Sequence, residues 1–303
     1  MLQKSIILHT FSTVKKGNTT LLVKDQYKET LSAVIFNMKT LDDRRTDTDA
    51  VKIGRGTYQT IPVAGNNGER LVVRNYRHGG LFGKLSGGVF YNKKRPVHEV
   101  AVNEIAFKNN VPSAEVVAII KRRFCGLFYK ADFVTREITD AVDLVQLITE
   151  SSLIFIQRFK RPIIRALAKL VRNMHDAGIF HADLHLKNIL VKHDADGEFH
   201  SYIIDLDKSV VAETLNINQR IKNLRRLDRS IEKLRWVSSK TNTSLYQKMS
   251  VISQVDKIRF FRLYMLCGNA LDKDWKRYIL KHHSRHVAHK LWWHILRYFH
   301  AIP

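Results

Sequence analysis

The sequence predicts an α+β protein of two lobes, with a β-rich N-lobe and a mainly helical C-lobe. Short apolar segments bounded by turn residues are typical of strands, and they dominate the first part of the chain, as in residues 71–76 and 127–134. Beyond residue 138, apolar residues recur at helical spacing, as in residues 163–177, which end at Gly178. We therefore expect an N-terminal extension over residues 1–50 that packs on or extends the N-lobe, an N-lobe over 51–138 and a C-lobe over 139–303.

Length and composition are those of a globular protein. The 303 residues can bury a substantial core, and a hydrophobic content of 45% is ordinary. The cysteines, Cys125 and Cys267, are too few for a disulfide framework, which favours a reducing cytoplasm. We see no secretory signal, and no segment approaches the ~20 apolar residues of a membrane-spanning helix.

Basic residues strongly outnumber acidic ones. The chain has 51 Lys and Arg against 28 Asp and Glu, a net charge of +23. Such a surface attracts polyanions, so nucleic acid, anionic lipid and phosphorylated substrates are all candidate partners. Because the chain has neither a zinc-ligand pattern nor an aromatic RNA-binding signature, we expect no specific nucleic-acid partner.

The most informative segment is His181-Ala182-Asp183-Leu184-His185-Leu186-Lys187-Asn188, which is followed by Ile203-Ile204-Asp205-Leu206-Asp207. Apolar runs and a turn-rich run over residues 193–198 lie between them, which is the pattern of a β-hairpin that brings the two acidic segments side by side. Asp183 can accept a proton from a bound hydroxyl, and Asn188 and Asp205 supply oxygens that suit Mg²⁺. These features predict phosphoryl transfer from ATP, in which positioning and charge neutralisation provide most of the catalysis.

The spacing H-x-D-x-x-x-x-N resembles the catalytic loop of protein-kinase-like enzymes, and Asp205 resembles their metal-binding aspartate. That resemblance implies a protein-kinase-like fold in which Asp183 is the catalytic base and Asn188 and Asp205 bind the metal. Two alternatives remain open. In one, the aspartates cap turns and His181 is structural. In the other, His181, Asp183 and His185 bind a hydrolytic metal ion.

A glycine pair lies earlier in the chain, in Gly54-Arg55-Gly56-Thr57-Tyr58, between strand-like residues 51–53 and 60–63. Glycines let backbone N–H groups approach phosphate oxygens closely, so Gly54 and Gly56 are candidate nucleotide-binding residues. A plain hairpin turn is the alternative.

Residues 71–76 contain Arg74 where a kinase-like fold places the lysine that holds the α- and β-phosphates. Arg and Lys are not interchangeable at such a site, and Lys84, in the glycine-rich basic loop 77–85, is a rival for the role. Glu99 follows Pro96 at the start of a helix and is the candidate partner of Arg74. Glu104 is the second choice, and a solvated surface glutamate is the alternative for both.

The remaining segments place the hinge and the basic helices. Residues 135–138 are expected to form a hinge whose backbone hydrogen-bonds the adenine. After Asp207 there is no A-P-E segment and no long activation loop, and a basic helix is expected over residues 220–235. The stretch from Trp275 onward mixes cations with aromatic residues, which suits a membrane surface or a terminal helix packed on the lobe.

Taken together, these motifs resemble the bacterial lipopolysaccharide-core sugar kinases, and most closely the kinases of 3-deoxy-D-manno-octulosonic acid (Kdo). The resemblance covers about residues 50–235 and rests on the glycine-rich segments, the catalytic loop, Asp205-Leu206-Asp207-Lys208 and the basic helix with Arg226-Leu227-x-Arg229-Ser230. It implies ATP- and Mg²⁺-dependent phosphorylation of a sugar hydroxyl on Kdo-lipid A. It also implies a peripheral protein at the cytoplasmic face of the inner membrane, with a lipid-linked sugar acceptor and an anionic membrane surface as partners.

Two other classes of function stay open at this point. One is a heptose kinase, or another small-molecule or protein kinase, which an acceptor screen with labelled ATP distinguishes. The other is a non-catalytic polyanion-binding protein, which would not bind ATP in a Mg²⁺-dependent manner. The sequence does not indicate the acceptor hydroxyl, the oligomeric state or any regulation.

Overall fold

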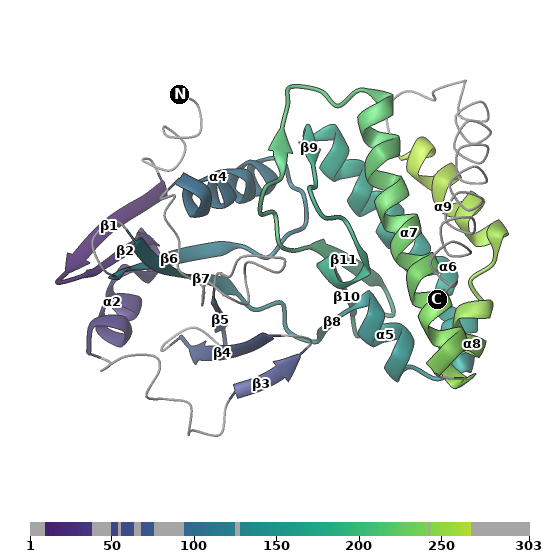
Figure 1. Ribbon diagram of the computed structural model, residues 1–303, viewed down its shortest axis with the longest axis horizontal. Helices are drawn as coiled ribbons and strands as arrows, with labels where there is room; N and C mark the ends of the chain where they lie inside the picture. The colour runs from purple at the N-terminus through teal and green to yellow at the C-terminus, as the bar shows by residue number, and fades with distance from the viewer. Residues whose placement is uncertain are drawn as a thin grey trace, which may run out of the picture. The chain divides into compact units, whose positions relative to one another are not determined.

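The computed structural model describes residues 10–37, 50–53, 56–63, 68–75, 94–124, 128–241 and 243–267. The chain divides into two compact units (Figure 1). The first contains residues 1–141 and 202–211, and the second contains residues 142–201 and 212–303. Residues 202–211, which hold Asp205, thus belong with the β-rich first unit although they follow the catalytic loop in sequence.

Within the described residues, seven strands of the first unit form one sheet in the order β1-β2-β6-β7-β5-β4-β3, and each described pairing is antiparallel. The strands are β1 (Phe11–Lys16), β2 (Thr19–Lys24), β3 (Ala50–Ile53), β4 (Gly56–Pro62), β5 (Arg70–Asn75), β6 (Val116–Phe124) and β7 (Phe128–Arg136). Antiparallel neighbours need only short connections, which is why the turn residues between apolar runs predicted most of these strands.

The N-terminal segment joins this sheet. β1 and β2 form a hairpin around Gly17, whose φ of +56° is a conformation that glycine adopts without strain. β2 then pairs with β6, with Leu21 opposite Ile120. β1 has little apolar signal in the sequence, because only Phe11 of this strand is buried.

Two apolar layers cover the opposite faces of the sheet (Figure 1). A short 3₁₀ turn, η1 (Asp25–Tyr27), and helix α2 (Lys28–Asn37) pack Tyr27, Leu31 and Ile35 against one face. Helix α4 (Lys94–Lys108) packs Val100 and Ala101 against the other face. α4 is thereby fixed over β6 and β7.

The second unit is mainly helical. Its elements are α5 (Leu144–Glu150), α6 (Leu153–Asp176), β9 (Ile179–Phe180), η2 (Leu186–Asn188), β10 (Ile189–His193), α7 (Ile217–Thr241), α8 (Thr243–Ser250) and α9 (Gln254–Leu266). β8 (Ala141–Asp143) and β11 (Phe199–Ile203) complete a small sheet in the order β11-β10-β8, so the predicted hairpin is present. β12 (Val210–Val211), later in the chain, belongs to the first unit.

Helix α6 is longer than the sequence predicted. We expected it to begin at residue 163, but it begins at Leu153 and contains Pro162. Ser152 caps its first turn by accepting a hydrogen bond from the Phe155 amide, and the apolar face continues across the proline through Ile156 and Ile163. The buried face therefore outweighs the hydrogen bond that the proline removes.

The helices of the second unit are joined by partly buried ion pairs. Lys160 of α6 lies 2.8 Å from Asp256, which also forms the capping box of α9 with Ser253. Lys257 of α9 lies 2.5 Å from Asp228 and 2.6 Å from Glu232, both on α7. The acidic side chains in the middle of α7 therefore face the helical core. The α+β class, with a β-rich first part and a mainly helical second part, is confirmed.

The turn after α6 allows a direct test of this packing. Gly178 has a φ of +72°, and a Cβ atom there would lie 1.8 Å from the carbonyl oxygen of Ala212. Left-handed backbone costs a non-glycine residue about 1–2 kcal/mol, and the clash adds to that cost. We expect Gly178→Ala to lower the free energy of unfolding, measured by chemical denaturation, by more than about 2 kcal/mol.

Gly197→Ala is the matched control. Gly197 has a φ of +87°, but no heavy atom lies within 4 Å of its Cβ position. The Gly197→Ala variant should lose only the conformational part of the free energy of unfolding, about 1 kcal/mol. Equal losses in the two variants would show that the contact with Ala212 contributes nothing.

Candidate active site

The first cluster of charges in the β-rich unit surrounds Arg74. Its guanidinium lies 2.7 Å from Glu99 Oε1 and 3.3 Å from Asp205 Oδ1, so the predicted pairing with Glu99 is present. The ring of Phe133 lies beside the guanidinium, with 5.7 Å between the ring centroid and Cζ. β5, α4 and the segment after β11 each contribute one charged side chain to this cluster.

Among the described residues joined by these ion pairs, two carboxylates, Glu99 and Asp205, face one cation, Arg74. Burial raises the pKa of Glu99 to about 7, Arg74 opposes the rise, and Asp205 and Asp207 add to it. Burial lowers the pKa of Arg74, but the two carboxylates more than offset that effect, and the net shift is upward. Glu99 Oε2 is buried without a hydrogen-bond partner among the described residues. The cluster therefore favours a further cation.

The loop that carries Asp205 is attached to the first unit on both sides. Before it, Ile203 exchanges backbone hydrogen bonds with Pro112 and Ala114, at 2.9 and 3.3 Å. After it, His98 of α4 lies within hydrogen-bond distance of the Ser209 carbonyl, at 2.8 Å. Asp205 itself has a φ of +61°, a strained conformation for a residue with a side chain and one that is common at functional sites.

The catalytic loop lies in the second unit. Asn188 is buried and donates its side-chain amide to the Asp183 carbonyl at 2.9 Å, which leaves the amide oxygen as a possible ligand. The Asp183 side chain is 74% exposed, and its Oδ2 lies 3.5 Å from His185 Nε2. An exposed carboxylate beside a backbone fixed by Asn188 is suited to receive a substrate hydroxyl.

Helix α7 holds this loop by hydrogen bonds that the sequence analysis did not identify. Asn223 exchanges hydrogen bonds with the backbone of His181, at 3.0 and 2.7 Å. Ser230 accepts from the Leu186 amide at 3.2 Å, and Arg226 donates to the Ala182 carbonyl. Asn223 was detectable in principle, because it lies at a buried position between Ile221 and Leu224 of an amphipathic helix.

His181 has a structural position. It is fully buried, and its Nδ1 accepts a hydrogen bond from the Asp183 amide at 3.0 Å. In the part of the chain that the structure describes, no three His, Cys, Asp or Glu side chains gather as a metal-binding group. The alternative of a hydrolytic metal held by His181, Asp183 and His185 therefore has no geometric support.

The other predicted site residues lie in the β3–β4 hairpin or outside the described residues. Gly56 is the first residue of β4, and it pairs with Ile53 across the β3–β4 turn. Gly54 and Lys84 lie outside the described residues. The stretch from Trp275 onward also lies outside them.

A strand arginine paired with a helix glutamate, together with an H-x-D-x-x-x-x-N loop, defines a phosphotransferase of the kinase class. The chain belongs to the lipopolysaccharide kinase (Kdo/WaaP) family, whose model matches residues 45–264.

The chain is similar to several named proteins. A 3-deoxy-D-manno-octulosonic acid kinase from Vibrio cholerae serotype O1 is 33% identical over 186 residues, which cover 59% of this chain and 72% of the relative. The enzyme of the same name from Photobacterium profundum is 34% identical over 189 residues, covering 59% and 71% of the two chains. Among solved structures, WaaP in complex with acyl carrier protein is similar with a TM-score of 0.49 at 17% identity, covering 86% of this chain and 98% of that one.

A double-mutant cycle tests the Arg74–Glu99 pair. Arg74→Ala and Glu99→Ala should each weaken Mg²⁺-ATP binding, measured by calorimetry, and together should cost less than the sum, because each removes the same ion pair. Arg123→Ala, which removes an exposed arginine from β6 of the same sheet, is the control and should leave binding unchanged.

The stability of the Arg74→Ala variant should also depend on pH. Without the cation, the buried Glu99 carboxylate is less stable, so its pKa rises further above the value in the unfolded chain. Stability present below about pH 4.5 is then lost as pH rises to the folded pKa, over a wider pH range and by a larger total than in the unmodified protein, as measured by chemical denaturation at a series of pH values. In the double-mutant cycle, fully additive effects of Arg74→Ala and Glu99→Ala on Mg²⁺-ATP binding would transfer the phosphate-holding role to Lys84. A larger loss of binding in Lys84→Ala would do the same.

Proposed function

We propose that this protein phosphorylates a hydroxyl of Kdo in the lipid A inner core, with ATP as the phosphoryl donor. The relatives named above are Kdo kinases, which supports Kdo as the acceptor sugar. The observation that carries the proposal is the cluster of Arg74, Glu99 and Asp205, because it joins a phosphate-binding cation to a carboxylate that can serve a metal.

The proposed reaction is an in-line transfer. Asp183 accepts the proton of the sugar hydroxyl as the oxygen forms its bond to the γ-phosphorus. The bond between that phosphorus and the bridging oxygen of ATP breaks, and ADP leaves with the electron pair. Arg74 holds the phosphates, with Lys84 and the backbone at Gly54 and Gly56 as further contacts. Residues 135–138 hold the adenine. The proposed lobes are residues 51–138 and 139–303, with residues 1–50 extending the first.

Mg²⁺ fits the donor atoms that the chain provides. Asp205 and Asn188 are the proposed ligands, and carboxylate and amide oxygens are what this hard cation prefers. The excess of negative charge around Glu99 supports a cation on the Asp205 side. When bound, the metal neutralises charge on the phosphates.

Substitution of the two aspartates should separate chemistry from binding. Asp183→Asn should keep Mg²⁺-ATP affinity but lower turnover by a factor on the order of 10² or more, because a general base is lost. Asp205→Asn should instead weaken Mg²⁺-dependent nucleotide binding. Asp196→Asn, in the exposed turn of the neighbouring hairpin, is the control for the same chemical change. Unchanged turnover in Asp183→Asn would refute the mechanism.

An acceptor screen tests the substrate. Purified protein and labelled ATP are incubated with Kdo-lipid A, with a heptose-bearing core and with a peptide mixture. We expect label only on the first acceptor. Transfer to the second would assign the protein as a heptose kinase, and transfer to peptide alone would overturn the sugar-kinase proposal.

A lipid-linked acceptor requires contact with a bilayer, and α7 offers a surface for it. Among the described residues, no helix is both long and apolar enough to cross a membrane. Four exposed side chains, spaced along one face of α7, form what we call the basic stripe: Arg229, Lys233, Trp236 and Lys240.

The acidic side chains of α7 do not cancel this charge. Asp228 and Glu232 are bound by Lys257 and face the helical core. Trp236 is 43% exposed, and Lys240 Nζ lies 4.7 Å from its ring centroid. A tryptophan among cations suits the headgroup level of an anionic membrane. We therefore propose that the basic stripe contacts the cytoplasmic face of the inner membrane.

Vesicle co-sedimentation tests the basic stripe. Each Lys near an anionic surface contributes about 1 kcal/mol, so Lys233→Gln/Lys240→Gln should weaken partitioning onto phosphatidylglycerol vesicles by roughly 30-fold at low salt. Arg165→Gln/Lys169→Gln removes two exposed cations from α6 and should have a much smaller effect. Equal losses in the two variants would mean that net charge alone drives binding. If Lys233→Gln/Lys240→Gln instead weakens binding to a random-sequence nucleic acid duplex and leaves vesicle binding unchanged, the stripe is assigned to nucleic acid.

A further inference from the structure

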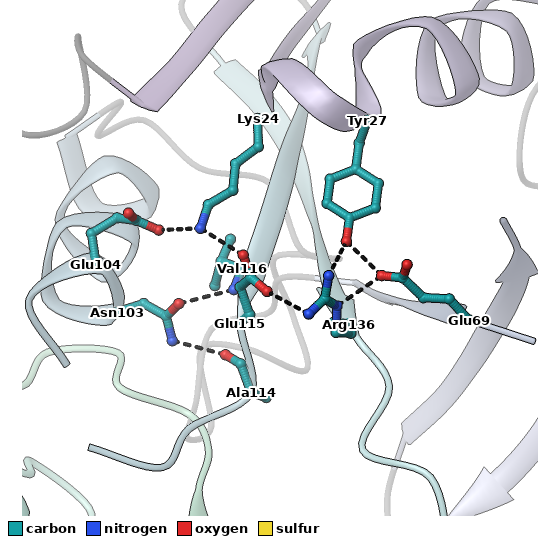
Figure 2. A network of polar contacts seen from close by, with 9 residues as sticks. All are labelled: Lys24, Tyr27, Glu69, Asn103, Glu104, Ala114, Glu115, Val116 and Arg136. Carbon is teal, nitrogen blue, oxygen red and sulfur yellow. Dashed lines mark hydrogen bonds and ion pairs between the residues drawn. The ribbon is translucent and has the colours of Figure 1, made fainter. Parts of the chain in front are cut away.

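The N-terminal segment, residues 11–37, lies outside the part of the chain that the family model matches, yet it supplies two buried polar side chains to the first unit. Lys24 ends β2 and is 7% exposed, and Tyr27 ends η1 and is 2% exposed. Figure 2 shows Lys24 reaching toward α4 and Tyr27 reaching toward Glu69 and Arg136. A buried lysine needs compensation, so its partners are informative.

Lys24 bridges two carboxylates. Its Nζ lies 2.7 Å from Glu104 Oε1 and 2.8 Å from Glu115 Oε1, and the three side chains are at most 11% exposed. Glu104 belongs to α4, and Glu115 directly precedes β6. Without the ammonium, two like charges would face each other in a poorly solvated space. Lys24 therefore holds α4 against the start of β6.

The same contacts extend to the end of β7. The guanidinium of Arg136 lies 3.3 Å from Glu115 Oε2 and 2.7 Å from Glu69 Oε1. Tyr27 donates its hydroxyl proton to Glu69 at 2.5 Å and accepts from Arg136 at 2.7 Å. Arg136 belongs to the segment, residues 135–138, to which we assign adenine binding. The N-terminal segment thus contacts both the helix that carries Glu99 and the strand end that leads into the hinge (Figure 2).

Asn103 also attaches α4 to the start of β6. Its side chain donates to the Ala114 carbonyl and accepts from the Val116 amide, each at 2.9 Å. The second half of α4 is therefore joined to the start of β6 by Asn103 directly and by Glu104 through Lys24. Glu99 lies on the same helix, so a shift of α4 moves the carboxylate that holds Arg74.

We propose that Lys24 is a positioning residue for the nucleotide site: it fixes α4, and α4 keeps Glu99 against Arg74. The inference rests on the proposed role of Arg74 in holding phosphates. Lys24 touches neither substrate. It acts by setting the distance between Glu99 and Arg74, and its removal should raise the KM for ATP more than the KM for the acceptor.

Lys24→Met/Glu104→Gln is the variant that tests this role. It removes the link to α4 and leaves no unpaired charge on that helix, while Glu115 keeps Arg136 as its partner. Lys15→Met, at an exposed lysine of β1, is the matched control. We expect the double variant to retain a cooperative thermal transition, to weaken Mg²⁺-ATP binding about 5-fold or more and to leave the acceptor KM unchanged. Unchanged ATP affinity in the folded variant would overturn the proposal.

A second comparison separates positioning from general weakening. In a Glu99→Gln background the same double substitution should reduce ATP affinity further by less than about 2-fold, because the group it positions is already lost. An equal reduction in both backgrounds would overturn the proposal. If Arg74→Ala weakens binding while the Lys24 variant does not, only the role of Lys24 fails. If neither does, the assignment of Arg74 fails with it.

Discussion

The ion pair between Arg74 and Glu99 is the interaction on which the functional geometry of the first unit depends. It joins a central strand of the sheet to α4, and Asp205 completes the cluster from a segment far along the chain. A guanidinium between two carboxylates is held in a fixed direction, and among the described residues these two carboxylates share one cation. The pair is a structural contact, and in the proposed mechanism it also prepares the site for phosphates and a metal ion.

Much of the secondary structure was predictable, because strands and hairpins are set by residues that are close in the sequence. The strands around Val73 and Phe133 combine apolar runs with turn residues, and the hairpin after Asn188 follows the same rule. The spacing of Asp183 and Asn188 is close enough for one loop to hold both, so their association was predictable. The pairing of Arg74 with Glu99 came from the resemblance to kinases, since nothing in the sequence around either residue requires it.

Features that depend on tertiary contacts were missed. The predicted start of α6 at residue 163 was wrong, because the buried apolar face continues through Pro162 and keeps the helix intact. The hydrogen bonds of Asn223 and Ser230 to the catalytic loop depend on the packing of α7 and were not predicted. One face of α7 orders the loop around Asp183, and another carries the basic stripe.

The position of β6 has a practical consequence. β6 lies between β2 and β7, and its pairing with β2 runs from Arg122 to Ala118. A protein expressed from residue 45, where the family model begins, would lack β1 and β2 and would leave the N–H and C=O groups of β6 unpaired at a new sheet edge. Open edges recruit strands from other molecules. Trimming this enzyme to its family boundaries for crystallisation or inhibitor screening would thus favour insoluble material, and retaining the chain from Phe11 avoids that outcome.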